Sequence, residues 1–181
     1  MKRRHTQPLA QATTSAHKEA TISQPFASPM DETAARHAFE KAMSTYTHDF
    51  ETFFLCRLYG LEFNYVDDRL VIDFPLHDFM YNPQGGLHGG VSAFILDVAM
   101  GHLLWRTLGT SGSTLELKTQ YLAPVRGSKG SCEAKFLRKG KTICFLEARL
   151  MDETGAPAVV ATSTWRVGNS IKKKSEPQPQ G

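Results

Sequence analysis

The sequence contains no uninterrupted apolar run of roughly 18 residues or more, so no membrane span is expected. Its three cysteines include no Cys-x-x-Cys pair, which favours reduced thiols in a cytoplasmic protein over a disulfide framework. No apolar segment follows the basic residues at the N terminus, so a secretory signal peptide is not expected. Neither an internal repeat nor a spacing typical of metal ligands is visible, so no metal is expected.

The central part of the chain also lacks a surplus of positive charge. The formal net charge of the 181 residues is +3. Residues 1–30 hold four basic residues and one acidic residue, and residues 168–181 hold three and one. The residues between these ends therefore carry a net charge of −2. A protein that binds nucleic acid is expected to have a basic folded face, so no nucleic-acid partner is predicted.

Composition divides the chain into one domain with two tails. Residues 1–30 are polar and sparse in large apolar groups, and residues 169–181 are rich in Pro, Gln and Lys, so both are expected to be disordered. The domain is predicted to span residues 31–168. The basic, Ser/Thr-containing start of the chain weakly resembles an organelle import segment, which is the alternative to a cytoplasmic location.

The first half of the domain is predicted to form a helix and a hairpin. Asp31 is placed to cap a helix over residues 32–46. Partial alternation over residues 55–66 and clear alternation over residues 70–74, around a turn at residues 67–68, predict two paired strands. The expected apolar stripe of the helix consists of Ala35, Phe39 and Met43.

A long apolar segment and four strand patterns follow. Residues 89–107 are apolar on nearly every side of a helix, which is typical of a buried helix. Strands are predicted at residues 113–123, 131–138, 142–151 and 157–167, and short turns that contain glycine should join the last three as an antiparallel meander. One curved antiparallel sheet over a single central helix is an α+β fold.

The central helix carries one unexpected acid. Asp97 and His102 are the only ionisable residues between Gly89 and Trp105. A carboxylate in such surroundings costs several kcal/mol unless it is paired, hydrogen-bonded or protonated. Asp97 is therefore either a member of a satisfied polar network or a reactive acid, and costly polar groups concentrate at functional sites. His102 is interpreted as a satisfied helix residue rather than a ligand.

The start of the same helix is the second candidate feature. Helix N-termini present free N–H groups and partial positive charge, and Gly89 has no side chain to block a substrate carbonyl. This pattern indicates an oxyanion-type site for acyl transfer. Asp97 lies about 12 Å further along the helix, so one helix cannot easily bring both groups to one carbonyl. Two antiparallel copies in a two-fold homodimer could share such sites.

The run Asn82-Pro83-Gln84-Gly85-Gly86-Leu87-His88-Gly89-Gly90, followed by Asp97, resembles the signature of PaaI-type acyl-CoA thioesterases of the hotdog superfamily. The resemblance covers roughly residues 57–167 and extends to residues 118–125 and 138–142. It implies a hotdog fold, with a six-stranded antiparallel sheet wrapped around a long central helix. It also implies homodimers, which often pair into homotetramers.

The resemblance implies a role for each matching residue. Asp97 corresponds to the catalytic acid, which acts as nucleophile or as general base for water. The Gly89 N–H would polarise the thioester carbonyl. His88 and Asn82 would lie near this carbonyl and the leaving sulfur, with Asn82 placing the nucleophile or water. Thr114 would help to hold the water. No cofactor is implied, because CoA is part of the acyl-CoA substrate.

Several alternatives stay open. Arg138, Lys139 and Lys141 form a basic hairpin that either contacts the phosphates of CoA or is a solvated turn. His88 and Asp97 could instead be the acid–base pair of a hotdog hydratase or dehydratase. The domain could also bind acyl-CoA or lipid without catalysis. The identity of the acyl group, and the choice between CoA and an acyl carrier protein, are not predicted.

Overall fold

The computed structural model describes residues 30–168, so the two segments expected to be disordered lie outside the described residues, apart from Met30. The predicted central helix and the predicted strands of the second half are present. In chain order the elements are α1 (Glu32–Thr45), α2 (Phe54–Leu58), β1 (Glu62–Val66), β2 (Arg69–Pro75), the 3-10 helix η1 (Asp78–Met80), α3 (Gly89–Leu108), β3 (Gly112–Tyr121), β4 (Lys129–Arg138), β5 (Ile143–Met151) and β6 (Pro157–Val167).

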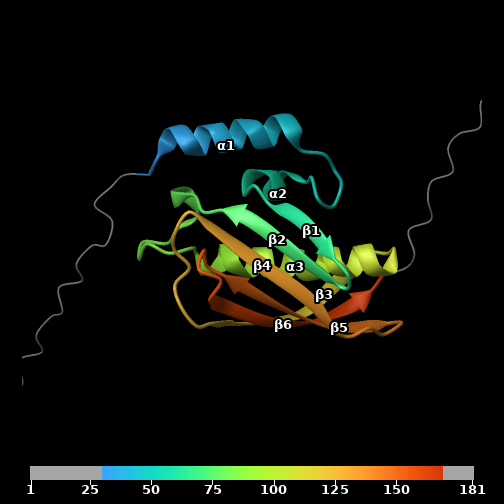
Figure 1. Cartoon of the computed structure of the whole chain (residues 1–181). Coiled ribbons are helices and arrows are strands. Elements are labelled where there is room, and N and C mark those ends of the chain that lie inside the picture. The colour runs from blue at the N-terminus through green and yellow to red at the C-terminus, as the bar shows by residue number, and fades with distance from the viewer. Residues whose placement is uncertain (1–29, 169–181) are drawn as a thin grey trace, which may run out of the picture.

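The six strands form one antiparallel sheet in the order β1-β2-β4-β5-β6-β3. The sheet curves around α3, and α1 and α2 lie outside it on the side of β1 (Figure 1). The predicted meander is confirmed as β4-β5-β6, while β3 pairs with β6 alone and forms one edge. This is the α+β hotdog architecture that the sequence predicted, and it places α3 at the centre of the molecule.

Helix α3 is buried because it is apolar on most of its circumference. Nine of its residues are buried, and it contacts β2, β3, β4, β5 and β6. The His88 side chain caps its start, and Gly109 ends it in the left-handed conformation at φ 64°. By length and composition alone α3 is apolar enough to cross a membrane. Half of its most apolar stretch is covered by the rest of the protein, as in the core helix of a globular domain.

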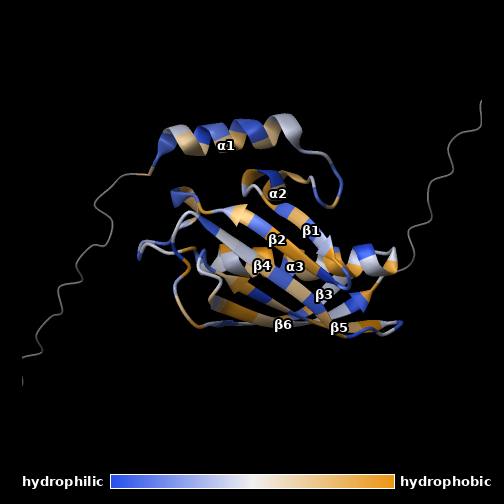
Figure 2. Ribbon diagram, viewed as in Figure 1, coloured by the Kyte–Doolittle hydropathy of each residue, from blue (hydrophilic) through white to orange (hydrophobic). Residues whose placement is uncertain are grey.

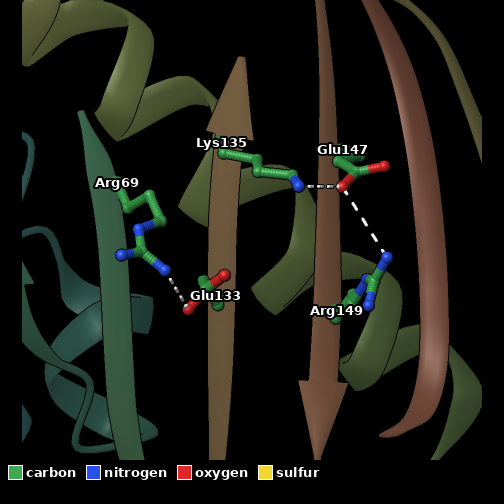
Figure 3. A network of polar contacts seen from close by, with 5 residues as sticks. All are labelled: Arg69, Glu133, Lys135, Glu147 and Arg149. Carbon is green, nitrogen blue, oxygen red and sulfur yellow. Dashed lines mark ion pairs between the residues drawn. The ribbon is translucent and has the colours of Figure 1, made fainter. Parts of the chain in front are cut away.

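The strands bury one face against α3 and expose the other. Leu70, Ile72 and Phe74 of β2 are buried in alternation, as predicted, and hydrophobic positions predominate along this strand in Figure 2. The exposed face carries ion pairs, which are each worth at most about 1 kcal/mol at a surface. Figure 3 shows these pairs: Arg69–Glu133 at 3.5 Å, Lys135–Glu147 at 2.9 Å and Arg149–Glu147 at 3.9 Å.

The predicted strand over residues 55–66 is wrong in its first part. Phe54–Leu58 forms the short helix α2, which places the Cys56 side chain in the core. Gly60 then turns the chain in the left-handed conformation at φ 63°. The strand begins only at Glu62, where regular alternation of exposed and half-buried residues begins.

Helix α1 has the predicted cap but not the predicted buried face. The Asp31 carboxylate accepts a hydrogen bond from the Ala34 N–H at 2.9 Å. Ala42 is the buried residue of the helix, whereas Phe39 and Met43 are each 51% exposed. The helix packs against α2, and the Phe39 ring takes part in this contact by meeting the Phe54 ring edge-on with the ring centres 5.6 Å apart.

Strand β3 contains an irregularity that was not part of the strand predicted at residues 113–123. The register with β6 shifts between Thr114 and Glu116, which is a β-bulge. Leu115 is consequently 57% exposed, while Leu117 packs against the core. The Ser163 hydroxyl donates to the Glu116 carbonyl at 2.5 Å and satisfies this acceptor.

The three cysteines are free thiols, as predicted. Cys56, Cys132 and Cys144 are all buried. Burial raises the pKa of the Cys56 thiol to about 12 and also raises the pKa of Cys132. Because the thiolate is the reactive form of cysteine, these two side chains act as packing residues.

Candidate active site

The Asp97 carboxylate lies on α3 facing strand β3. The Thr114 hydroxyl donates a hydrogen bond to Asp97 Oδ1 at 2.8 Å. Burial raises the pKa of Asp97 above its ordinary value, and the hydrogen bond from Thr114 opposes this by stabilising the charged form. The structure therefore brings together two of the predicted site residues, and the carboxylate is half-buried with one accepting oxygen fixed.

A cavity of about 420 Å³ opens beside this carboxylate, and we call it the Asp97 pocket. Gly101 contributes to its shape, because a Cβ atom there would lie 2.7 Å from Cη2 of Trp165. Because Gly101 has no side chain, the Trp165 indole lies closer to α3 than it could if any other residue stood at position 101. The pocket is lined by His48, Asp49, Phe50, Phe53, Asp97, Val98, Gly101, His102, Gly112, Thr114 and Trp165.

A second cavity, of about 410 Å³, lies at the start of α3, and we call it the Gly89 pocket. Gly89 is the first residue of the helix. His88 Nδ1 accepts from the Gly90 N–H at 2.9 Å, and the Tyr121 hydroxyl donates to the Gly89 carbonyl at 2.9 Å. No described residue accepts a hydrogen bond from the Gly89 N–H. The pocket is lined by Asn82, Gln84, Gly86, Leu87, Gly89, Ser92, Tyr121, Leu122, Ala123, Pro124, Val125, Arg126 and Val159.

Asn82 builds the loop in front of this helix. Its side-chain carbonyl accepts from the Gln84 N–H at 2.8 Å and from the Gly86 N–H at 3.5 Å. Its backbone N–H donates to the Gly86 carbonyl at 2.9 Å. The side-chain oxygen is therefore engaged in shaping the loop, and the amide NH₂ group is the part of Asn82 that can meet a substrate.

The predicted site residues fall into two separate groups within one chain. Asp97 and Thr114 line one pocket, whereas Asn82 and Gly89 line the other, with His88 beside Gly89 as the helix cap. The two linings have no residue in common. This separation agrees with the estimate of about 12 Å along the helix between positions 89 and 97.

The basic hairpin does not reach either pocket within the chain. Arg138 ends β4, Lys139 and Lys141 lie in the β4–β5 connection, and all three are absent from both linings. Lys139 Nζ lies 4.9 Å from the centre of the Phe136 ring. The hairpin lies at the end of the sheet where β5 meets the end of β6, opposite the end that contains the Gly89 pocket.

The sequence did not predict the aromatic side of the Asp97 pocket. Phe50 and Phe53 come from the connection between α1 and α2, which has no periodic pattern. The prediction that His102 is a hydrogen-bonded helix residue is supported, because its ring nitrogens lie 2.8 Å from the Val98 carbonyl oxygen and 2.6 Å from the Phe50 carbonyl oxygen, and a neutral ring donates its one N–H to one of them. Burial lowers the pKa of His102.

Tyr121 is a further residue of the site that sequence reasoning missed. Its strand position gave no signal, because its importance comes from the hydrogen bond to Gly89 across the fold. Within residues 30–168, no group of three or more His, Cys, Asp or Glu side chains is arranged to hold a metal ion.

Comparison with known proteins identifies related sequences and structures. The model of the thioesterase superfamily matches residues 84–159. A protein of Saccharolobus solfataricus assigned as an esterase is 30% identical over 101 residues, which are 55% of this chain and 71% of that protein. The medium/long-chain acyl-CoA thioesterase YigI of Salmonella typhimurium is 32% identical over 101 residues, which are 47% of this chain and 64% of YigI. The chain thus spans less than two thirds of the length of YigI.

The fold has a similar match among solved structures. The BH2602 protein of Bacillus halodurans, whose crystal structure was determined with CoA, superposes with a TM-score of 0.71 at 24% sequence identity. The match covers 80% of this chain and 98% of the Bacillus protein. At this identity the likeness supports the fold.

Proposed function

The chain belongs to the thioesterase superfamily of hotdog-fold thioester hydrolases, and we propose that it hydrolyses acyl-CoA thioesters to a free carboxylic acid and CoA. A CoA substrate is supported by the name of the Salmonella relative and by the CoA of the Bacillus structure. The observation that carries the proposal is the half-buried Asp97 carboxylate, oriented by Thr114 in a pocket with aromatic walls.

The proposed reaction uses Asp97 in its ionised form. As general base, the carboxylate takes a proton from a water molecule while the water oxygen attacks the thioester carbonyl carbon. The carbon–sulfur bond then breaks, and the CoA sulfur leaves and is protonated. As nucleophile, Asp97 would itself form an anhydride that water then hydrolyses. The contact between Thr114 and Asp97 suits either course, because it fixes the carboxylate.

The Gly89 pocket supplies the groups that meet the carbonyl and the sulfur. The unpartnered Gly89 N–H at the positive end of α3 would stabilise the oxyanion. Because His88 Nδ1 accepts from the Gly90 N–H, the proton of a neutral His88 ring sits on Nε2. This N–H would donate to the leaving sulfur, and the Asn82 NH₂ group would hold the water or the substrate.

The separation of the two pockets supports a homodimer with shared sites. Asp97 of one copy would act with the Gly89 pocket of the other copy, since neither pocket contains a complete set of groups. Strand β3 forms an edge of the sheet and carries the Thr114 side chain. An edge strand presents unpaired backbone groups to a second copy. Pairing of such dimers into homotetramers remains a prediction.

The remaining parts of the proposal concern binding and location. Arg138, Lys139 and Lys141 would contact the CoA phosphates from a neighbouring copy, because they do not reach a pocket of their own chain. No cofactor takes part in the proposed reaction. Buried free thiols support the proposed cytoplasmic location.

A panel of acyl-CoA thioesters tests this function by the free thiol that each releases. We expect Asp97→Asn to lose about 10²–10⁴-fold in kcat, the usual contribution of a general base, while the protein stays folded. Asp73→Asn, a change at an exposed aspartate of β2 that binds Asn64, is the matched control and should retain activity. Near-normal turnover by Asp97→Asn would refute the assignment.

Two further assays separate the alternatives from hydrolysis. Addition of water to an enoyl-CoA without thiol release would indicate a hydratase. Saturable binding of acyl-CoA with no reaction would indicate a non-catalytic domain.

A further inference from the structure

The connection between α1 and α2, residues 47–53, crosses α3 as a strap and is fixed there by three contacts. The Phe50 carbonyl contacts His102 Nε2 at 2.6 Å. The Phe50 ring stacks on Trp105 with the ring centres 4.6 Å apart and the planes within 8°. The Tyr65 hydroxyl of β1 donates to Glu51 at 2.8 Å. The strap is therefore held by both α3 and the sheet.

The strap supplies one wall of the Asp97 pocket. Phe50 and Phe53 line it from the strap side, and Val98 and Trp165 line it from α3 and β6. Phe53 also packs edge-on against Phe94 of α3, with the ring centres 6.2 Å apart. The strap side of the pocket is thus aromatic, and the contact with Phe94 supports the Phe53 ring.

We propose that this strap selects the acyl group, with Phe50 and Phe53 as the residues that set the size of the group accepted beside Asp97. The inference rests on the proposed acyl-CoA hydrolysis. Hydrolysis requires the thioester carbonyl carbon to lie at Asp97 or at its water, and the acyl group continues from that carbon. The acyl group is the apolar part of the substrate, and the aromatic wall of the Asp97 pocket is the matching surface.

The charged groups of the pocket restrict the substrate class further. Asp49 lines the pocket together with Asp97. A third carboxylate carried on the acyl group would be repelled by both, because like charges in a partly desolvated site disfavour one another. The selected class is therefore an uncharged acyl group with an apolar or aromatic body.

The strap contacts make the wall able to discriminate by size. An added methylene in a hydrophobic pocket changes binding by about 1–3 kcal/mol, or roughly 10–200-fold, when the wall does not yield. The Phe50 carbonyl contact to His102 and the stacking on Trp105 hold the backbone of the strap against α3. Truncation of Phe53 should consequently enlarge the space without releasing the strap, because both of these contacts are made by Phe50.

The test compares kcat/KM profiles over CoA thioesters of uncharged acyl groups, from acetyl to palmitoyl and phenylacetyl, and over the negatively charged glutaryl group. The best substrate of the wild type is the reference. For Phe53→Ala we expect kcat/KM for longer substrates, divided by kcat/KM for this reference, to rise about 10-fold. Phe53→Leu should give a smaller change in the same direction. Phe39→Ala, at an exposed phenylalanine of α1 that lines neither of these pockets, should leave the profile unchanged.

The outcomes separate this inference from the proposed function. If the wild-type protein releases no thiol from any member, the hydrolysis itself is refuted. Circular dichroism verifies that Phe53→Ala and Phe53→Leu are folded. If the wild type is active but these variants keep its substrate profile, or lose activity equally on all substrates, then selection of the acyl group by the strap is refuted and the proposed hydrolysis is not affected. A preference of the wild type for glutaryl-CoA would also refute the proposed selection of uncharged acyl groups.

Discussion

Two opposing effects act on the Asp97 carboxylate. Burial disfavours its charged form and raises its pKa, and the hydrogen bond from Thr114 favours the charged form and lowers it. Burial is the larger effect, so the pKa lies above the ordinary 3.8 of an aspartate. A raised pKa brings the acid nearer to the pH at which a general base works best. Thr114 thus lowers the pKa of Asp97 and also orients its carboxylate.

This balance predicts the pH dependence of hydrolysis. Activity requires ionised Asp97, so kcat/KM should fall as the pH drops through a pKa above 3.8. Thr114→Val removes the hydrogen bond that lowers this pKa, and the acid limb of the profile should therefore move to higher pH. Thr114→Ser keeps a hydroxyl and should keep the wild-type limb. An acid limb that is identical in the valine variant would show that Thr114 does not act on the titrating group.

At the scale of elements, the start of α3 leaves the Gly89 N–H available as a hydrogen-bond donor. The His88 cap engages the Gly90 N–H, and Tyr121 holds the Gly89 carbonyl. The Gly89 N–H has no acceptor among residues 30–168. The first helical position tolerates proline because its N–H has no partner within the helix. His88 has ψ 134°, which is the extended conformation that a residue before proline requires.

Gly89→Pro should consequently remove this donor and leave the helix intact. We expect kcat to fall about 10²–10³-fold, as for other lost oxyanion donors, with little change in the thermal unfolding midpoint. Gly89→Ala keeps the N–H, and its Cβ would make an ordinary 3.4 Å contact with the Tyr121 ring. It should lose much less activity than the proline variant. Equal kcat values in the two variants would exclude the Gly89 N–H from catalysis.

The sequence predicted those elements whose periodicity reflects burial. Helix α3 and strand β2 were predicted because α3 is covered on most sides and β2 on one. Helix α2 was mistaken for a strand, since its five residues are too few to show a helical period. The strap could not be predicted, because Phe50 and Phe53 meet Asp97 only through the fold. The resemblance supplied Thr114, and geometry then showed its contact with Asp97.

At the scale of the whole molecule, the two halves of the proposed site lie in different pockets of one chain. Asp97 and Thr114 are placed by the middle of α3 and by the edge strand β3. Asn82, His88 and Gly89 are placed by the other end of α3 and its preceding loop. A rigid helix keeps these groups apart, and we therefore propose that a working site forms between two copies of the chain in antiparallel orientation.

Mixed dimers test this sharing directly. Asp97→Asn and Gly89→Pro chains with different tags are co-expressed, and the heterodimer is isolated through both tags. One of its two sites then combines an intact Asp97 with an intact Gly89, whereas the other site carries both defects. We expect about half of the wild-type activity per dimer from this arrangement, while each variant homodimer stays inactive.

The same heterodimer would be inactive if each chain formed a complete site, because every chain then carries one defect. Light scattering of the purified species verifies that the measured activity belongs to a dimer. Wild-type activity retained at concentrations where light scattering shows only monomers would contradict sharing independently of the variants. Activity in the heterodimer and in neither variant homodimer would establish that the Asp97 pocket of one chain works with the Gly89 pocket of the other.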